Sequence, residues 1–190
     1  MSLFHLVVAP GIELRQFEMS DAETLFAVAD RNRPYLREWL PWVDRTHSAD
    51  EIRDYIAARL EQFEARQGPN AAICLNGEIV GALGCHPIDW ANRHCSIGYW
   101  IDAALQGKGL MTRSCAALID YLFHEMGIHR VTIQCGTGNP KSCAIPDRLG
   151  FTREGVMREA EWVNDRWVDL VVWGMLAQDW KTRAIPSTPP

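Results

Sequence analysis

The sequence has no excess of basic residues and no long apolar run. Its 190 residues contain 19 Lys and Arg against 24 Asp and Glu, for a net charge of −5. Proteins that bind nucleic acids generally carry a basic excess, so direct nucleic-acid binding is not expected. Membrane-spanning helices need runs of about 18 or more apolar residues. None occurs, so no membrane span is predicted.

Targeting, disulfide and metal signals are also lacking. The N-terminus MSLFHLVVAPG has no positively charged segment before a long apolar core, so no signal peptide is expected. The cysteines form no CxxC pair, and most lie in apolar stretches, where a free thiol behaves as a small hydrophobic group. We therefore expect reduced thiols and a cytoplasmic protein. His124 and His129 do not have HExxH spacing, and no metal site is predicted.

The order of the predicted elements indicates a mixed α/β sheet. Capping-box patterns at Ser20 with Glu23 and at Ser48 with Glu51 predict two helix starts. A long helix follows residue 110, and a short one begins after Asn139. The predicted strands are residues 12–18, AAICL and IVGALGC on either side of an Asn-Gly turn, CSIGYWID, RVTIQC, FTREGVMREAEW and RWVDLVVWGML. We predict one domain over residues 1–180 and a flexible tail at 181–190.

Residues 105–114, LQGKGLMTRS, join a predicted strand to the long helix through two glycines. Backbone N–H groups that converge at a helix N-terminus bind phosphate, and glycine lets the backbone approach a ligand closely. A dinucleotide-binding loop needs a third glycine, GxGxxG, where this chain has Thr112. The Walker pattern GxxxxGK[ST] is absent as well.

A third phosphate-binding pattern fits this turn. Gln106, Gly109 and Met111 match a polar residue, a glycine and a small residue at the required spacing, with Met in place of the usual Gly or Ala. This resembles motif A of the GNAT (Gcn5-related) N-acetyltransferases, which holds the pyrophosphate of coenzyme A. The resemblance spans roughly residues 10–178 and includes NPKSCAIPDRLGF. The segments WLPW, IGYWID and EAEW are similar to the RimL-type branch, the ribosomal-protein N-terminal acetyltransferases.

The resemblance implies a fold and a cosubstrate. The fold is a central mixed, mostly antiparallel sheet flanked by helices, with a parallel strand pair that splays between CSIGYWID and RVTIQC. Acetyl-CoA would lie in that wedge, and a backbone N–H near Trp100 or Ile101 would polarise its carbonyl. The cofactor-binding residues implied by the resemblance are Trp100, Ile101, Asp102, Gln106, Gly107, Lys108, Gly109, Leu110, Met111, Asn139 and Ser142.

Acetyl transfer also needs a base and a proton donor. An α-amine has a pKa near 8 and lysine one near 10.4, so both are mostly protonated at neutral pH. Glu161 in REAEW matches the general base of the RimL-type branch, and Glu159, with the same strand parity, remains an alternative. Ser142 matches the serine near the cofactor sulfur, although it can equally serve the helix N-terminus. No tyrosine follows Asn139, which excludes the tyrosine acid that many GNAT enzymes carry there.

Three further features of the sequence bear on the site. An acetyl-cysteine at Cys135 is conceivable, but nothing near it in the sequence activates the thiol. Pro146 lies inside the short helix after Asn139, so a kink or an early end is expected. Four tryptophans fall in segments that would line an acceptor groove: Trp39, Trp42, Trp162 and Trp167.

The expected activity is direct acetyl transfer from acetyl-CoA to an amine. The RimL-type resemblance implies the N-terminal α-amine of a protein, a ribosomal protein in particular, as acceptor, and a homodimer. One alternative acceptor is a small amine such as an antibiotic or a polyamine. Two different classes of function also stay open: a non-catalytic coenzyme-A sensor, and an interaction protein that uses the aromatic segment WLPW.

Overall fold

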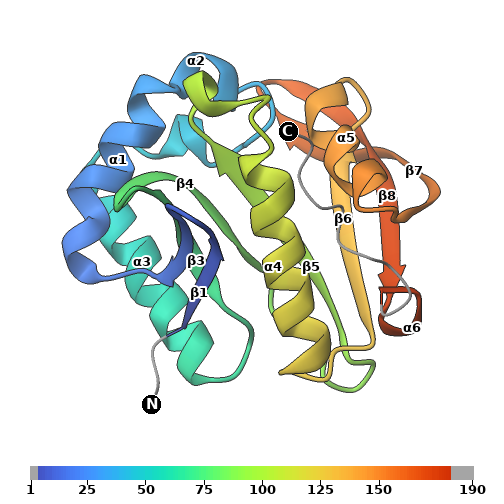
Figure 1. Ribbon diagram of the computed structural model, residues 1–190. Helices are drawn as coiled ribbons and strands as arrows, with labels where there is room; N and C mark the ends of the chain where they lie inside the picture. Colours follow the sequence, from blue (N-terminus) through green and yellow to red (C-terminus); the bar gives the residue numbers. More distant parts are fainter. Residues whose placement is uncertain (1–3, 181–190) are drawn as a thin grey trace.

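The computed structural model describes residues 4–180 (Figure 1). The predicted flexible tail at 181–190 lies outside the described residues. An eight-stranded sheet runs in the order β1-β2-β3-β4-β5-β6-β8-β7. Its strands are β1 His5–Ala9, β2 Ile12–Gln16, β3 Asn70–Leu75, β4 Glu78–Cys85, β5 His94–Ile101, β6 Arg130–Gly136, β7 Thr152–Val163 and β8 Arg166–Leu176.

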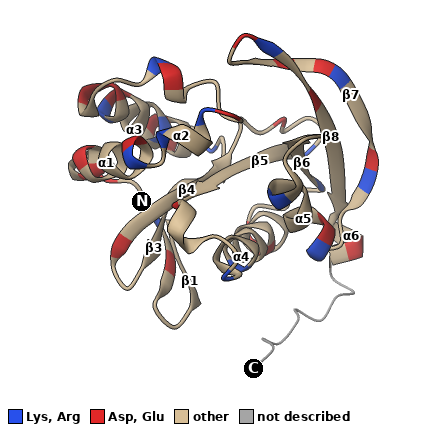
Figure 2. Cartoon of the chain, turned by 90° about the horizontal axis from the view of Figure 1, so that it is seen from above, with Lys and Arg blue, Asp and Glu red and all other residues tan. Residues whose placement is uncertain are grey.

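All neighbouring strands are antiparallel except β5 and β6, which run parallel. Helices cover both faces of the sheet, with α4 and α5 on one side and α1–α3 on the other (Figure 2). The predicted mixed, mostly antiparallel fold with one parallel pair is therefore confirmed. The helices are α1 Ala22–Arg31, α2 Arg33–Leu36, α3 Ala49–Glu64, α4 Leu110–His124, α5 Pro140–Arg148 and α6 Ala177–Trp180. None of the helices within residues 4–180 is long and apolar enough to cross a membrane.

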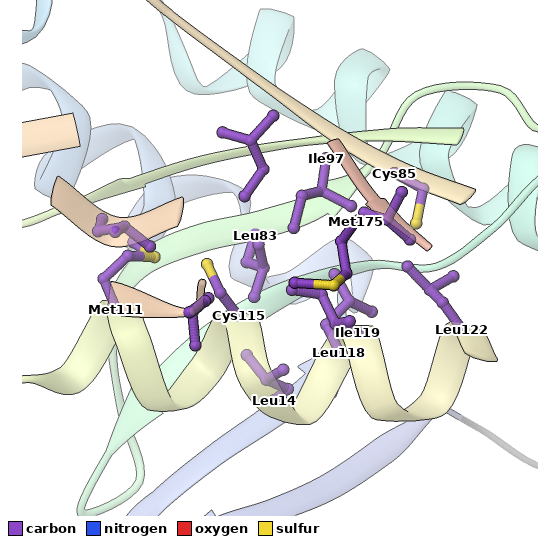
Figure 3. Packing of buried hydrophobic residues seen from close by; sticks show 14 of the residues in the cluster. Leu14, Leu83, Cys85, Ile97, Met111, Cys115, Leu118, Ile119, Leu122 and Met175 are labelled. Carbon is purple, nitrogen blue, oxygen red and sulfur yellow. The ribbon is translucent and has the colours of Figure 1, made fainter. Parts of the chain in front are cut away.

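The long helix α4 packs against the centre of the sheet (Figure 3). The apolar face predicted from its sequence is buried, with Leu118, Ile119 and Leu122 each at 1% exposure or less. These side chains share one core cluster with Leu14 and Leu83 from the strands. Burial of a Leu or Ile side chain contributes about 1.5–3 kcal/mol to stability, so this contact holds the N-terminus of α4 against the sheet.

The start of α1 differs from the prediction. The helix opens with a 3₁₀ turn at Met19–Asp21, and Glu18 with Asp21 forms the capping box in place of Ser20 with Glu23. The reason is tertiary: Arg15 on β2 donates two hydrogen bonds, of 2.7 and 2.8 Å, to the Asp21 carboxylate. Asp21 also accepts the backbone N–H of Glu18 at 2.8 Å. The second predicted capping box, Ser48 with Glu51, is confirmed.

Replacement of Asp21 by asparagine is expected to destabilise the fold by about 2 kcal/mol, because it leaves the partly buried Arg15 without its anionic partner. Burial disfavours the ionised Asp21, but the hydrogen bonds from Arg15 and Glu18 outweigh it and hold the pKa below its ordinary value. The contribution of Asp21 is thus present above about pH 4 and lost as the pH falls through the folded-state pKa.

Urea unfolding of Asp21→Asn and wild type at pH 7 and at pH 3 measures this effect. The gap between the two proteins should narrow at the lower pH. Asp44→Asn is the matched control, since the pair of Asp44 with Arg37 is exposed and such pairs contribute little. Equal losses for the two variants would contradict the assignment.

Candidate active site

The parallel strands β5 and β6 separate partway along their length. They pair only at His94 with Arg130, Cys95 with Val131, and Ser96 with Thr132. Beyond this point β5 stays paired with β4, and β6 stays paired with β8. The predicted wedge between CSIGYWID and RVTIQC is therefore present, and it opens into a cleft of about 2640 Å³.

The hydrogen-bond parity of β5 determines which backbone groups face the wedge. The N–H of Asp102 bonds to the Val80 carbonyl, and the Ser96 carbonyl accepts from the N–H of His86, both toward β4. In an antiparallel pair such bonding alternates along the strand. Trp100 therefore directs its backbone groups to β4, whereas those of Tyr99 and Ile101 point to the open side. The Ile101 carbonyl accepts a hydrogen bond from the Tyr35 hydroxyl. The N–H of Ile101 also points to the open side, where it is available to a ligand.

Trp100 lines the cleft with its side chain, whereas the side chain of Asp102 supports the turn after β5. The Trp100 ring lines the cleft and lies 6.0 Å from the Trp42 ring, measured between centroids. The Asp102 carboxylate accepts a 2.6 Å hydrogen bond from Arg31 and a 3.0 Å bond from the N–H of Ala104. Asp102 thus braces the turn that follows β5, next to the residues that line the cleft.

The glycine turn enters α4 with two residues in the left-handed region. Gly107 has φ 75° and Gly109, the N-cap of α4, has φ 71°. A Cβ on either would meet no atom within 4 Å, so the backbone conformation, and not crowding, requires glycine there. All the predicted residues of the turn line the cleft: Gln106, Gly107, Lys108, Gly109, Leu110 and Met111.

Leu110 and Met111 have buried side chains, so they offer a ligand only their backbone. Lys141 at the start of α5 donates a 2.9 Å hydrogen bond to Gln106 and ties α5 to the turn. Four basic side chains line this end of the cleft: Lys108, Arg113, Lys141 and Arg148. The turn therefore presents backbone donors, a helix N-terminus and positive charge to one region, which suits a diphosphate.

Within the wedge, β5 and the start of α5 bring three polar side chains together, those of Tyr99, Asn139 and Ser142. Asn139 caps α5 by accepting the N–H of Ser142 at 3.1 Å, as predicted. The Tyr99 hydroxyl lies 3.3 Å from the Ser142 hydroxyl and 4.0 Å from the Cys135 sulfur. Tyr99 also donates to the Ser142 carbonyl at 3.1 Å.

Pro146 explains why the Ser142 carbonyl is available to Tyr99. The helix α5 continues to Arg148, so the early end predicted at Pro146 is wrong. Proline lacks the N–H that would bond to the carbonyl four residues earlier, and that carbonyl belongs to Ser142. The Tyr99 hydroxyl takes the place of the missing donor. The tertiary contact compensates the helix for the proline and orients the hydroxyl of Tyr99.

Burial keeps the thiol and the phenol of this cluster neutral. It raises the pKa of Tyr99 well above its ordinary value, and it raises the pKa of Cys135 to about 12. Cys135 is only 3% exposed. A thiolate nucleophile at Cys135 is therefore disfavoured at neutral pH, which argues against the acetyl-cysteine route.

The two candidate bases on β7 differ in position. Glu161 pairs opposite Val168, is partly buried and lines the cleft, and burial raises its pKa. Glu159 lies in a bulge between Met157 and Glu161, where its φ is 49° and its N–H bonds to Asp169 at 2.8 Å. The bulge breaks the parity that the alternation implied, so the two carboxylates do not share a strand face. Glu159 is exposed and is not among the cleft-lining residues.

Of the four tryptophans expected in the acceptor groove, the structure brings only Trp39 and Trp42 to the cleft. The Trp39 ring packs over two glycines of the loop after β6: a Cβ on Gly136 would lie 2.9 Å from it, and one on Gly138 would lie 3.1 Å away. Trp162 and Trp167 stack edge to face near the tip of the β7–β8 hairpin and are 47% and 56% exposed.

The sequence interpretation missed several residues of the cleft. Tyr99 could have been found from its strand parity with the buried Ile97 and Ile101. Tyr35 and Arg59 come from helices distant in sequence, and no local pattern marks them. Within residues 4–180, no three His, Cys, Asp or Glu side chains converge in a way that could hold a metal ion.

Comparison with known proteins identifies the family of this chain. The family model of the acetyltransferase (GNAT) domain matches residues 12–152. YdaF of Bacillus subtilis (strain 168), provisionally named a ribosomal N-acetyltransferase, is 36% identical over 94% of this chain and 98% of its own length.

Two solved structures share the fold and contain the cosubstrate or its product. RimL, a ribosomal L7/L12 alpha-N-protein acetyltransferase in complex with coenzyme A, superposes with a TM-score of 0.89 at 27% identity, covering 93% of this chain and 99% of RimL. The microcin C7 self-immunity acetyltransferase MccE, in complex with acetyl-CoA and AMP, gives 0.84 at 28% identity, covering 89% and 94%. The chain therefore belongs to the GNAT family and is an acetyl-CoA-dependent N-acetyltransferase of the ribosomal-protein acetyltransferase type.

Proposed function

We propose that this enzyme acetylates the N-terminal α-amine of a protein, a ribosomal protein in particular, by direct attack on acetyl-CoA in the cytoplasm. The observation that carries the proposal is the position of Glu161. It lines the same cleft as the glycine turn and the splayed strands, but it comes from β7, which lies beyond β6 and β8 in the sheet. The similarity to RimL supports a protein N-terminus as acceptor.

Two regions of the cleft hold two parts of the cosubstrate, the diphosphate and the pantetheine arm. The backbone donors from Gln106 to Met111 and the N-terminus of α4 hold the diphosphate, with Lys108 and Arg113 adding positive charge. The pantetheine arm lies along the open edge of β5, where the N–H of Ile101 faces the wedge. The same N–H polarises the thioester carbonyl as negative charge develops on its oxygen.

Glu161 accepts the proton that the ammonium group must lose before it can attack. The neutral amine then forms a bond to the thioester carbon, and the C–S bond breaks to release the thiolate of coenzyme A. As the amide forms, its nitrogen loses a second proton, which replaces the one that Ser142 and Tyr99 give to the sulfur. Ser142 and Tyr99, whose hydroxyls lie 3.3 Å apart at the end of the wedge, return a proton to that sulfur. No acetyl-enzyme is formed, because the Cys135 thiol is buried and un-ionised.

Replacement of Ser142 by alanine is expected to lower kcat about tenfold, with little change in the KM for acetyl-CoA, because it removes a proton donor near the sulfur. Steady-state kinetics with saturating acceptor measures this. Ser114→Ala is the matched control, since Ser114 is buried on α4 and is not among the cleft-lining residues. An unchanged kcat in both Ser142→Ala and Tyr99→Phe would exclude this pair as the proton source.

The acceptor is tested by a screen of peptide N-termini, polyamines and aminoglycoside antibiotics for acetyl-CoA-dependent thiol release. Peptides acetylated at the α-amine, identified by mass spectrometry, are the expected products. Acetylation of the small amines alone would replace the proposal with a small-molecule acceptor, which the structural similarity to MccE supports. Tight binding of acetyl-CoA without turnover on any amine would indicate a sensor. The homodimer remains a prediction for sedimentation analysis.

A further inference from the structure

The helix α3 presents a stripe of polar side chains to the acceptor side of the cleft. Glu51, Tyr55 and Arg59 all line the cleft, and their spacing of four residues places them along one face of the helix. The other basic lining residues named above come from the glycine turn, α4 and α5, where the diphosphate binds. Arg59 is thus the one arginine among the cleft-lining residues that comes from α3, and α1–α3 lie on the face of the sheet opposite α4 and α5 (Figure 2).

Arg59 has no anionic partner among residues 4–180. Its guanidinium carbon lies 5.4 Å from the centroid of the Tyr55 ring. Its Nε is buried and makes no hydrogen bond, and no carboxylate of the described chain lies within 4.0 Å of it. Arg53 on the same helix is different, because it forms ion pairs with Glu23 and Asp50. The Tyr55 ring supports the Arg59 guanidinium while its charge stays free.

Glu51 does not neutralise this charge. Its carboxylate accepts the backbone N–H groups of His47 and Ser48 at 2.5 and 3.0 Å. It lies eight residues from Arg59, about 12 Å along the helix. Arg59 therefore offers a preformed site for a carboxylate brought by another molecule.

The position of Arg59 relative to the reaction centre follows from the sheet. Arg59 and His86 line the same cleft, and the pKa of His86 is lowered by partial burial and by the Arg59 charge. The N–H of His86 bonds to the Ser96 carbonyl, and Ser96 is three residues before Tyr99 on β5. Three residues of strand span about 10 Å. An extended peptide whose amine lies near Tyr99 and Glu161 would bring its third or fourth residue to Arg59.

We propose that Arg59 is a specificity-determining residue that selects acceptor peptides with Asp or Glu at the third or fourth position. The inference rests on the proposed function, acetylation of a protein N-terminus. In this arrangement the acceptor amine lies at Glu161, and the acceptor carboxylate binds Arg59.

The test compares hexapeptide amides that differ only by Asp or Asn at position three or four. Wild-type enzyme is expected to prefer the Asp peptide about tenfold in kcat/KM, as for one partly exposed charged hydrogen bond. Arg59→Gln should abolish the preference by lowering kcat/KM for the Asp peptide, while the KM for acetyl-CoA stays that of wild type. Arg59→Glu should reverse the preference toward a Lys peptide. Arg53→Gln, on the same helix but outside the cleft, should retain the wild-type preference.

The outcomes separate this inference from the function on which it rests. If wild type acetylates Asp and Asn peptides equally, or if Arg59→Gln keeps the preference, Arg59 does not select the acceptor although the enzyme still modifies protein N-termini. If no peptide is acetylated at all, the proposed function is wrong and this inference falls with it.

Discussion

Glu161→Gln is expected to lower kcat about 10²–10³-fold while leaving the affinity for acetyl-CoA unchanged. Glutamine keeps the size and hydrogen-bonding shape of the side chain but cannot accept the proton of the ammonium group. Glu161 lies on β7, outside the turn at Gln106–Met111 that we propose binds the diphosphate. Steady-state kinetics with a peptide acceptor and calorimetric titration with acetyl-CoA measure the two quantities separately.

The pH profile provides a second measure of Glu161. Burial raises its pKa above the ordinary value, and a base acts only in its ionised form. Wild-type kcat/KM should therefore fall as the pH drops through this raised pKa, and Glu161→Gln should lose that limb. Because folding raises the pKa, the ionised carboxylate lowers stability as the pH rises through it. The glutamine variant should accordingly be at least as stable as wild type at pH 7.

Glu159→Gln is the matched control. It makes the same chemical change two residues away, at an exposed carboxylate in the bulge of β7. Its kcat should stay within about twofold of wild type, as for surface substitutions remote from the chemistry. A large loss in Glu159→Gln with normal activity in Glu161→Gln would exchange the roles of the two residues.

Gly109→Ala is expected to raise the Kd for acetyl-CoA about ten- to a hundredfold. The N-cap of α4 has φ 71°, and an alanine there costs about 1–2 kcal/mol in the left-handed region. The strain is relieved by rotation of the turn, which moves its N–H groups away from the diphosphate. A Cβ also obstructs the close approach of that ligand to the backbone. Calorimetric titration measures Kd.

Gly127→Ala separates strain from binding. Gly127, just beyond the other end of α4, has φ 69°, and a Cβ added there, as at Gly109, would meet no atom within 4 Å. Both variants should lose similar stability in urea unfolding, since both place alanine at a positive φ. Only Gly109→Ala should lose acetyl-CoA affinity. Equal Kd values for the two variants would show that the turn does not bind the diphosphate.

Several elements were predictable because their signals are local. The hairpin at Asn76-Gly77 needs two residues with positive φ, and the structure gives them 51° and 85°. The capping box at Ser48 and the glycines of the turn likewise act within a few residues of themselves. The apolar face of α4 follows from its helical spacing. These features, with the resemblance in the glycine turn, were sufficient for the fold and the family.

The remaining features depend on contacts between distant segments. Asp21 joins the capping box of the 3₁₀ turn before α1 because Arg15 on β2 reaches it, and α5 continues past Pro146 because Tyr99 supplies the missing donor. Whether Glu159 or Glu161 faces the cleft is decided by a bulge in β7, and Arg59 lines the cleft only when α3 packs on the sheet. By itself the sequence determined most elements and the glycine turn before α4, because backbone conformation and apolar periodicity are local. Only the tertiary structure decided which side chains share the cleft, because strand register and helix packing bring them together.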